Sequence, residues 1–279
     1  MQVDEIELRE RARRLNLGVD HVVRDLVQAR FVSAVFTQAA GDLVLKGGLA
    51  MRSIFGSSRF TKDVDLQTTP RLPKARVASI VRQALKEAMA TGFLKDVSMS
   101  EPKQTDTVQR WKVTGTVGET PIHMTVEVSR RGLPPAAHIV TRQMTDLTGK
   151  ERPAYSYSSS AIAAGKVAAL ASPNRVAPRD VYDLDLLIST DVEPPIDLLV
   201  GMGRKELQEA LAELWPKLDL MTFKLASESL LEYLPREEAA KFDETSWEER
   251  RLRTGENVER WLHEALERID SLESGGPRP

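Results

Sequence analysis

Two aspartates one residue apart, Asp63 and Asp65, are the strongest chemical signal in the sequence. They stand in the segment RFTKDVDL (59–66), which predicts a strand over 60–66. Side chains alternate across a strand, so both carboxylates point to one face, roughly 6.5–7 Å apart. Two carboxylates that close favour a bound cation, and oxygen ligands of this kind suit Mg²⁺.

A Gly-Gly pair precedes the aspartates, with Asp63 following Gly48 by 15 residues. The segment LVLKGG (43–48) predicts an apolar strand, a tight turn and the start of a short helix. Gly47 and Gly48 leave backbone N–H groups accessible there, and such groups can receive phosphate. The two segments together predict a nucleotide-and-metal site. The alternative is a surface β-hairpin with two solvated aspartates and an ordinary turn.

Both segments resemble the signature of a known family. KGGLAMR (46–52) and RFTKDVDL (59–66) are similar to the pattern KGGTAL…RF[ST]xD[ILV]D of the AbiEii/AbiGii toxin family. Its members are nucleotidyltransferases of the DNA polymerase β superfamily and include the MenT toxins. The resemblance implies an α+β fold, in which a polymerase-β-type domain with a small mixed sheet flanked by helices precedes a helical domain.

A β-region follows, with strands expected at 97–100, 108–117 and 122–129 and a hairpin turn at Gly118-Glu119. Alternation in the last of these strands puts Glu127 on its polar face. That residue either belongs to a half-exposed strand face or serves as a ligand. In the polymerase β superfamily a third carboxylate on a neighbouring strand completes the metal site, and the resemblance implies Glu127 for that place.

A second polar group follows residue 155. Lys166 is the only charged residue of a helix expected at 161–170, and its stem can lie along apolar surface with the amine in water. Asp180 and Asp183 are three residues apart and share a helix face. AGK (164–166) and RDVYDL (179–184) are similar to AxK…RDxxDLxxL, the family's second signature. The resemblance therefore implies Lys166 and Asp180 as catalytic residues, with Asp183 as the alternative to Asp180.

Two domains are expected, 1–155 with N-terminal helices and the nucleotidyltransferase sheet, and 156–279 as a helical domain that completes the active site. Residues 130–157 are rich in Pro, Gly, Thr and Arg, which predicts a connector with one short strand at its end. In the second domain, Pro216, Pro235 and a break at Thr254-Gly255 are expected to separate helices.

Composition narrows the class of protein. The chain has 279 residues, no cysteine and four histidines, which excludes disulfides and thiolate zinc sites. No stretch is long and apolar enough for a membrane span, and the start of the chain is acidic, so a cytoplasmic protein without a membrane partner is expected. Residues 1–179 hold 27 Lys and Arg against 17 Asp and Glu, and residues 180–279 hold 12 against 24. A basic face that attracts nucleic acid or triphosphate is compatible with this asymmetry.

The predicted chemistry is Mg²⁺-dependent nucleotidyl transfer from a nucleoside triphosphate (NTP). Asp63, Asp65 and Glu127 would hold the metal, and Lys166, held by Asp180, would reach the triphosphate as a point charge. Phosphate contacts are expected from the backbone of Gly47 and Gly48 and from the Thr61 hydroxyl. Four cations are further candidates, and each can equally be ordinary surface charge: Lys46, Arg52, Arg59 and Lys62.

The acceptor of the nucleotide does not follow from these residues. The MenT relatives imply the 3′ end of tRNA, and the toxin family implies a cognate antitoxin as partner. Two alternatives remain at this point. One is transfer to protein hydroxyls, on the chain itself or on a partner. The other is a non-catalytic nucleotide-binding or regulatory protein, which would have no need of two metal carboxylates.

Overall fold

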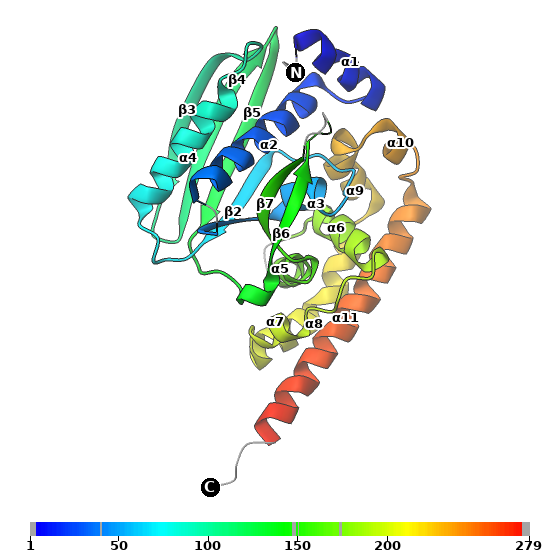
Figure 1. Ribbon diagram of the computed structural model, residues 1–279. Coiled ribbons are helices and arrows are strands. Elements are labelled where there is room, and N and C mark those ends of the chain that lie inside the picture. The colour runs from blue at the N-terminus through cyan, green and yellow to red at the C-terminus, as the bar shows by residue number, and fades with distance from the viewer. Residues whose placement is uncertain (1–3, 40, 147–148, 150, 173–174, 275–279) are drawn as a thin grey trace. The chain divides into compact units, whose positions relative to one another are not determined.

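The computed structural model describes residues 4–39, 41–146, 149, 151–172 and 175–274 (Figure 1). The chain divides into two compact units. The first comprises Met1–Ser158 and Tyr233–Glu238, and the second comprises Ser159–Glu232 and Ala239–Pro279. The short segment Tyr233–Glu238 thus belongs to the first unit, although its neighbours in sequence belong to the second.

A seven-stranded mixed sheet forms the centre of the first unit, in the order β3-β4-β5-β2-β1-β7-β6. The strands are β1 (Leu43–Lys46), β2 (Asp63–Thr68), β3 (Lys95–Gln104), β4 (Val108–Val117), β5 (Thr120–Ser129), β6 (Ile139–Thr145) and β7 (Glu151–Tyr157). β2 pairs in parallel with β5 and β1 in parallel with β7, while the other pairs are antiparallel. This pairing brings β1, β2 and β5, which carry the predicted site, next to each other.

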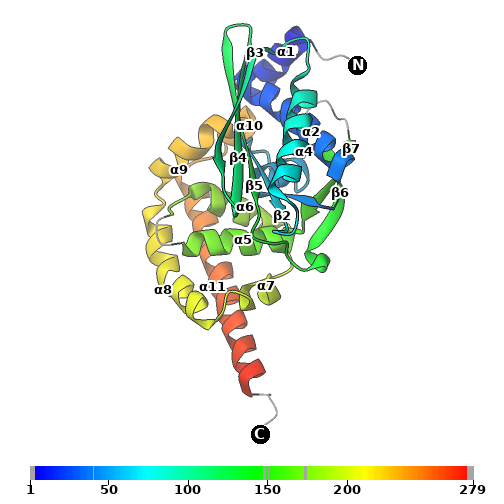
Figure 2. The same ribbon diagram turned by 90° about the vertical axis from the view of Figure 1, so that its left-hand side faces the viewer.

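Helices of the first unit are α1 (Glu5–Leu15), α2 (Val19–Ala39), α3 (Gly47–Ser53) and α4 (Lys74–Met89), with a 3₁₀ turn at Ala136–His138. α2 and α4 lie on the same side of strands β3, β4 and β5 (Figure 2). α2 is apolar on most sides, and Val23, Phe31 and Val35 are fully buried. One face of these strands is therefore covered by helices, and the other carries alternating polar residues.

The second unit is helical. Its elements are α5 (Ser159–Ala171), α6 (Pro178–Ser189), α7 (Ile196–Val200), α8 (Arg204–Leu220), α9 (Phe223–Leu230), a 3₁₀ turn that begins at Leu231 and ends at Tyr233, and α11 (Glu244–Ser274); α10 (Arg236–Ala239) begins in the first unit. Trp247 and Trp261 are almost fully buried, and the Trp247 indole donates to the Met221 carbonyl at 2.7 Å. Large aromatic side chains thus anchor α11.

Two predicted helix breaks in this unit are wrong. Pro216 lies inside α8, and α11 runs without interruption through Gly255. An ideal Cβ at Gly255 would lie 2.5 Å from the Trp215 ring and 2.8 Å from Leu218. The glycine is therefore explained by the close approach of α8 to α11 and not by a turn.

The connector predicted at 130–157 is also wrong in part, because it contains the antiparallel hairpin β6–β7. β7 joins the sheet through a single parallel register pair, Leu45 with Ser156, and the Ser156 hydroxyl donates to the Leu45 carbonyl at 3.2 Å. The hairpin lies at the edge of the sheet, where turn-forming and charged residues are common. Strand β6 and most of strand β7 were therefore not predicted, because the composition of this segment is typical of a connector.

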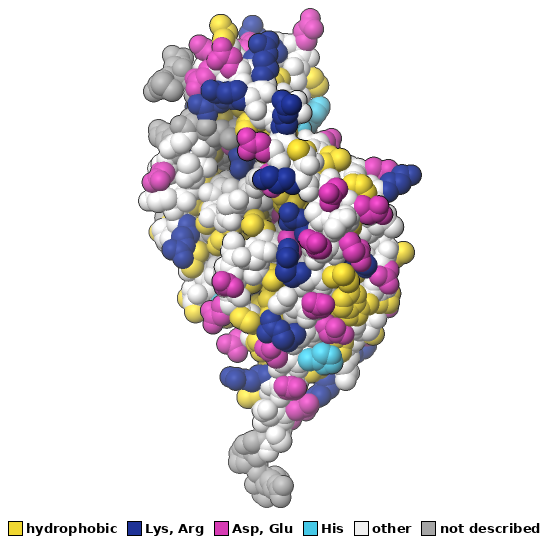
Figure 3. Space-filling view, turned by 90° about the vertical axis from the view of Figure 1, so that its right-hand side faces the viewer, with side chains coloured by type: hydrophobic (Ala, Val, Ile, Leu, Met, Phe, Trp, Pro, Cys, Tyr) yellow, Lys and Arg dark blue, Asp and Glu magenta, His cyan; other side chains and the backbone are white. Residues whose placement is uncertain are grey.

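Charged side chains of both signs are spread over one face of the molecule (Figure 3). On the face shown in Figure 3, Lys and Arg side chains are interspersed with Asp and Glu. The contrast between the basic and acidic parts of the sequence thus does not appear there as two fields of opposite sign. Among the described helices, none combines the length and the apolar character that crossing a bilayer requires.

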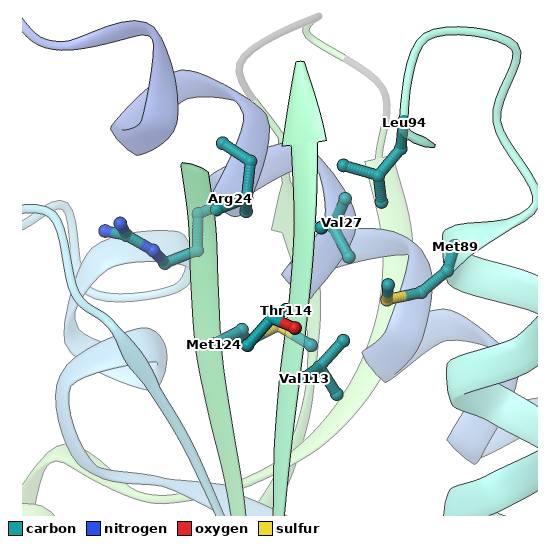
Figure 4. A pocket seen from close by; sticks show the side chains of 9 residues that line it. Arg24, Val27, Met89, Leu94, Val113, Thr114 and Met124 are labelled. Carbon is teal, nitrogen blue, oxygen red and sulfur yellow. The ribbon is translucent and has the colours of Figure 1, made fainter. Parts of the chain in front are cut away.

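A small cavity of about 10 Å³ lies between α2, the end of α4 and strands β4 and β5 (Figure 4). Its walls are mainly apolar, from Val27, Met89, Val113 and Met124. Figure 4 shows that the guanidinium of Arg24 points away from these side chains, and it donates instead to the His123 carbonyl and to Asp20. A void of this size holds one water at most, so it is a packing gap and not a ligand pocket.

Candidate active site

The carboxylates of the first unit lie on neighbouring strands. Asp63 begins β2, and Asp65 follows on the same face; both side chains are partly exposed. Across the parallel pair, Asp65 is the register partner of Glu127 in β5. Across the antiparallel pair, Asp65 is the register partner of Lys46 at the end of β1. Strand pairing therefore brings the carboxylates of Asp63, Asp65 and Glu127 and the amine of Lys46 together on neighbouring strands of the sheet.

Gly47 is the residue that leaves room for Asp65. Its φ is 69°, a conformation that favours glycine, and an ideal Cβ there would lie 2.3 Å from Asp65 Oδ2. A carboxylate therefore occupies the space that any other side chain at this position would need. The sequence predicted an open backbone at this glycine, and the structure adds this second reason for it.

Gly48 lies against two more of the predicted residues. An ideal Cβ at Gly48 would be 3.1 Å from Thr61 Oγ1 and 3.2 Å from Arg59 Nη2. Arg59 is only 4% exposed, so it is not surface charge. Its guanidinium is held beside the beginning of α3, where backbone N–H groups already favour anions.

Thr61 was predicted on the strand, and this is wrong, because β2 begins at Asp63. The Asp63 amide donates to Thr61 Oγ1 at 3.3 Å, and Gln28 in α2 donates to the Thr61 carbonyl at 3.2 Å. The hydroxyl therefore fixes the entry of the chain into β2. The prediction failed because a buried loop whose polar groups are hydrogen-bonded within the protein can have the same apolar sequence pattern as the end of a strand.

Lys46 is the cation closest to the carboxylates in register. Burial lowers the pKa of its amine below the usual value, Asp65 and Glu127 oppose that shift, and Arg131 adds to it. Loss of water around the amine outweighs the nearby negative charges. Lys46 is partly exposed, and an added anion beside it would favour the charged form of its amine.

Arg110 contacts Glu127 and was not predicted. Its Nε and Nη2 donate to Glu127 Oε2 at 2.9 and 2.5 Å. The position of Arg110 could have been predicted from the hairpin turn at Gly118-Glu119. Counting residue pairs outward from that turn places Arg110 opposite Glu127.

Among the residues that the structure describes, no group of three or more His, Asp or Glu side chains is arranged to hold a metal ion. Asp63 and Asp65 offer oxygen donors that fit Mg²⁺, whereas Glu127 is turned to an arginine.

Two other cations named from the sequence have structural contacts. Arg52 pairs with Asp25 at 3.4 Å, and its guanidinium stacks 4.2 Å from the centre of the Phe60 ring. Lys62 is exposed, with its amine 5.0 Å from the centre of the Tyr233 ring. Both contacts help to fasten the segment between α3 and β2.

In the second unit, Lys166 holds two carboxylates together. Its amine donates to Asp180 Oδ1 at 3.1 Å and to Asp183 Oδ2 at 2.6 Å, and all three side chains are buried. Arg175 adds two bonds to Asp180 Oδ2, at 2.9 and 2.7 Å. The sequence left Asp180 and Asp183 as alternatives, and the structure shows both on the same amine.

Lys166, Asp180 and Asp183 tie α5 to α6 and are buried, whereas Arg175, between the two helices, is half exposed. Buried ion groups of this kind need complete partnering to be stable. That this cluster and the carboxylates of β2 face one active site stays a prediction. Chemically, the first unit offers oxygen ligands and cations for a metal–phosphate group, and the second offers a preorganised charged cluster.

Comparison with known proteins identifies the class. The profile of one family, described as the nucleotidyl transferase AbiEii toxin of type IV toxin–antitoxin systems, matches residues 30–269. No curated protein matches the chain in sequence.

Two crystal structures from Helicobacter pylori have a similar fold. The protein JHP933 is 16% identical with a TM-score of 0.56, covering 92% of this chain and 98% of its own. A protein described as a nucleotidyltransferase is 18% identical with a TM-score of 0.53, covering 89% and 97%. These similarities confirm the α+β, polymerase-β-like fold. With the family match across most of its length, the chain belongs to the AbiEii family of nucleotidyltransferase toxins.

Proposed function

We propose that this chain transfers a nucleotide from an NTP to the 3′ end of tRNA, using Mg²⁺ held by Asp63 and Asp65, with Glu127 as the third ligand once its carboxylate leaves Arg110. The observation that supports this most is the register of β1, β2 and β5, which puts Lys46, Asp65 and Glu127 side by side. A site for binding alone has no need of paired metal carboxylates. The helical second unit would complete the site.

Each residue has a definable task in this proposal. When bound, Mg²⁺ supplies charge neutralisation on the triphosphate and a lowered pKa for the attacking hydroxyl. Gly47 keeps the Asp65 carboxylate in place, while Lys46 and Arg59 attract the phosphates. Phosphoryl-type transfer depends chiefly on positioning and positive charge, which these residues supply.

The second unit would act through Lys166. Its amine, aligned by Asp180 and Asp183, would donate to a phosphate oxygen of the NTP as a point charge. The proposal further includes an antitoxin as partner, as the family implies, and a cytoplasmic location, where tRNA is available.

The direct test is transfer of label from each radiolabelled NTP to total tRNA in the presence of Mg²⁺. We expect labelled tRNA with the intact chain, none after metal chelation and none with Asp63→Asn. Asp42→Asn is the matched control, because Asp42 is exposed at the other end of β1. Label found only in protein would show self-modification. Nucleotide binding without any transfer would show a regulatory protein.

Metal binding needs a test that does not depend on activity. Mn²⁺ binding, measured by electron paramagnetic resonance, should weaken at least tenfold in Asp65→Asn and stay unchanged in Asp42→Asn. Equal binding in all three proteins would refute the metal assignment.

A further inference from the structure

The face of β3, β4 and β5 that lies opposite α2 and α4 continues the carboxylate site across the sheet. Register pairs run outward from Asp63 through Thr125 in β5 and Lys112 in β4 to Ser100 in β3. A parallel row leads from Asp65 through Glu127 and Arg110 to Lys103. We call this surface the open face; it carries Ser98, Ser100, Lys103, Lys112, Thr114 and Thr125.

Two exposed lysines, Lys103 and Lys112, lie on the open face. Within the described part of the chain, Lys103 and Lys112 are exposed and form no ion pair. On the opposite side, Lys74 pairs with Asp106 at 2.8 Å and Arg82 pairs with Glu101 at 2.5 Å. Uncompensated positive charge therefore remains on the open face. Arg76 and Lys86 of α4 are also exposed and, among the described residues, form no ion pair, so what distinguishes the open face is its continuity with the carboxylate site.

Hydroxyl groups accompany these amines. Ser98 and Thr114 share a hydrogen bond of 2.8 Å across β3 and β4, and Ser100 lies in register with Lys112. Lysine amines and serine or threonine hydroxyls are common donors to nucleic-acid phosphates, to which they add position without base specificity. The surface is held by strand pairing, so its donors keep their spacing.

From these observations, and resting on the proposed transfer to a nucleic-acid 3′ end, we infer that the open face binds the sugar–phosphate backbone of the acceptor strand. Neighbouring strands are about 4.8 Å apart, so Lys112 lies about 10 Å across the sheet from Asp63. Phosphates just before a 3′ end placed at the carboxylates would therefore lie over β5 and β4. Contacts to backbone alone would make recognition of the strand independent of its sequence.

The test compares two double variants of the full chain. Lys103→Ala with Lys112→Ala removes two charges from the open face, and Arg76→Ala with Lys86→Ala removes two exposed charges from α4. The dissociation constant for tRNA is measured by filter binding over a series of KCl concentrations. The open-face variant should bind on the order of tenfold more weakly at low salt, with a salt dependence smaller by about one phosphate contact per lysine. The α4 variant should bind as the intact chain does.

The outcomes separate this inference from the proposed function. An unchanged salt dependence in the open-face variant, or an equal loss in the α4 variant, would overturn the inference. If tRNA binding depends on Lys103 and Lys112 but no nucleotide is transferred, the inference holds and the proposed function fails. If the intact chain transfers label and the open-face variant has the same KM for tRNA, the inference fails and the function holds.

Discussion

Gly47 occupies a position at which a single methyl group has no room. Replacement by alanine costs about 1–2 kcal/mol for the left-handed backbone and also displaces the Asp65 carboxylate. Gly56→Ala is the matched control, because Gly56 has a φ of 75° and an added Cβ there would meet no atom within 4 Å. In urea unfolding, Gly56→Ala should show the backbone cost alone and Gly47→Ala at least that cost, and only Gly47→Ala should lose Mn²⁺ binding. Equal Mn²⁺ binding in the two variants would contradict this reading.

Tyr157 provides a pH-dependent prediction at the same scale. Burial raises the pKa of its phenol to about 12. The folded state therefore keeps a proton that the unfolded state releases near pH 10, so this contribution to stability is complete below pH 10 and is lost as the pH rises towards 12. Ultraviolet titration of the intact chain minus Tyr157→Phe should show a tyrosinate step with its midpoint above pH 11. A midpoint near 10 would contradict the burial effect.

Helices α11 and α5 each contain an interior glycine, and replacing these two glycines by alanine should change the stability in opposite directions. Gly255 faces the Trp215 ring closely, whereas an added Cβ at Gly165 meets no atom within 4 Å. Gly255→Ala should destabilise the protein by about 1–3 kcal/mol through overpacking. Gly165→Ala should stabilise it by about 0.5–1 kcal/mol through helix propensity. Thermal unfolding of both variants decides the matter, and equal shifts would refute the packing argument.

The connection between α5 and α6 depends on the buried cluster around Lys166. Lys166→Met would leave Asp180 and Asp183 buried without their shared cation, at a cost of about 3–5 kcal/mol. Asp183→Leu should also destabilise, and the double variant should cost less than the sum of the two. Additive losses in urea unfolding would show that the contacts carry no coupling. Any loss of nucleotide transfer in Lys166→Met must therefore be compared with the fraction of that variant that is folded.

Much of the element structure follows from local pattern, and the failures share one cause. β4 coincides with its predicted range because strict alternation and a two-residue turn define it. The β6–β7 hairpin, the start of β2 and the continuity of α11 depend on partners distant in sequence. Gly255 is a clear case, since the same residue marks a helix end or a close helix contact.

The candidate site shows the same division. The types and spacing of Gly47, Gly48, Asp63 and Asp65 predicted which residues would gather, and pairing of β1 with β2 brings them together. Arg110 and the double engagement of Lys166 were not predicted because a side chain's partner is chosen by packing and rotamer. The register of the β4–β5 hairpin could be predicted from the sequence, and it places Arg110 opposite Glu127. Register alone does not predict that the two side chains form hydrogen bonds.

For the whole chain, the division into two units has a measurable consequence. Tyr233 belongs to the first unit, where its carbonyl accepts from the Phe60 amide at 2.9 Å and its ring contacts His21. Tyr233→Ala should therefore raise hydrogen exchange in α2 and around Phe60. Phe242→Ala, which removes a ring beside Phe223 and Trp247, should raise exchange in the second unit instead. The same exchange pattern in both variants would contradict the division.

The placement of Tyr233–Glu238 also bears on how this protein can be used as a tool. A cut after Ser158 yields two polypeptides, of which the second carries a piece that completes the fold of the first. Reassembly of such halves would require donation of a segment and not merely contact between finished domains. The chain is thus suited to conversion into a split reporter, in which recovery of a signal records that two fused proteins have met.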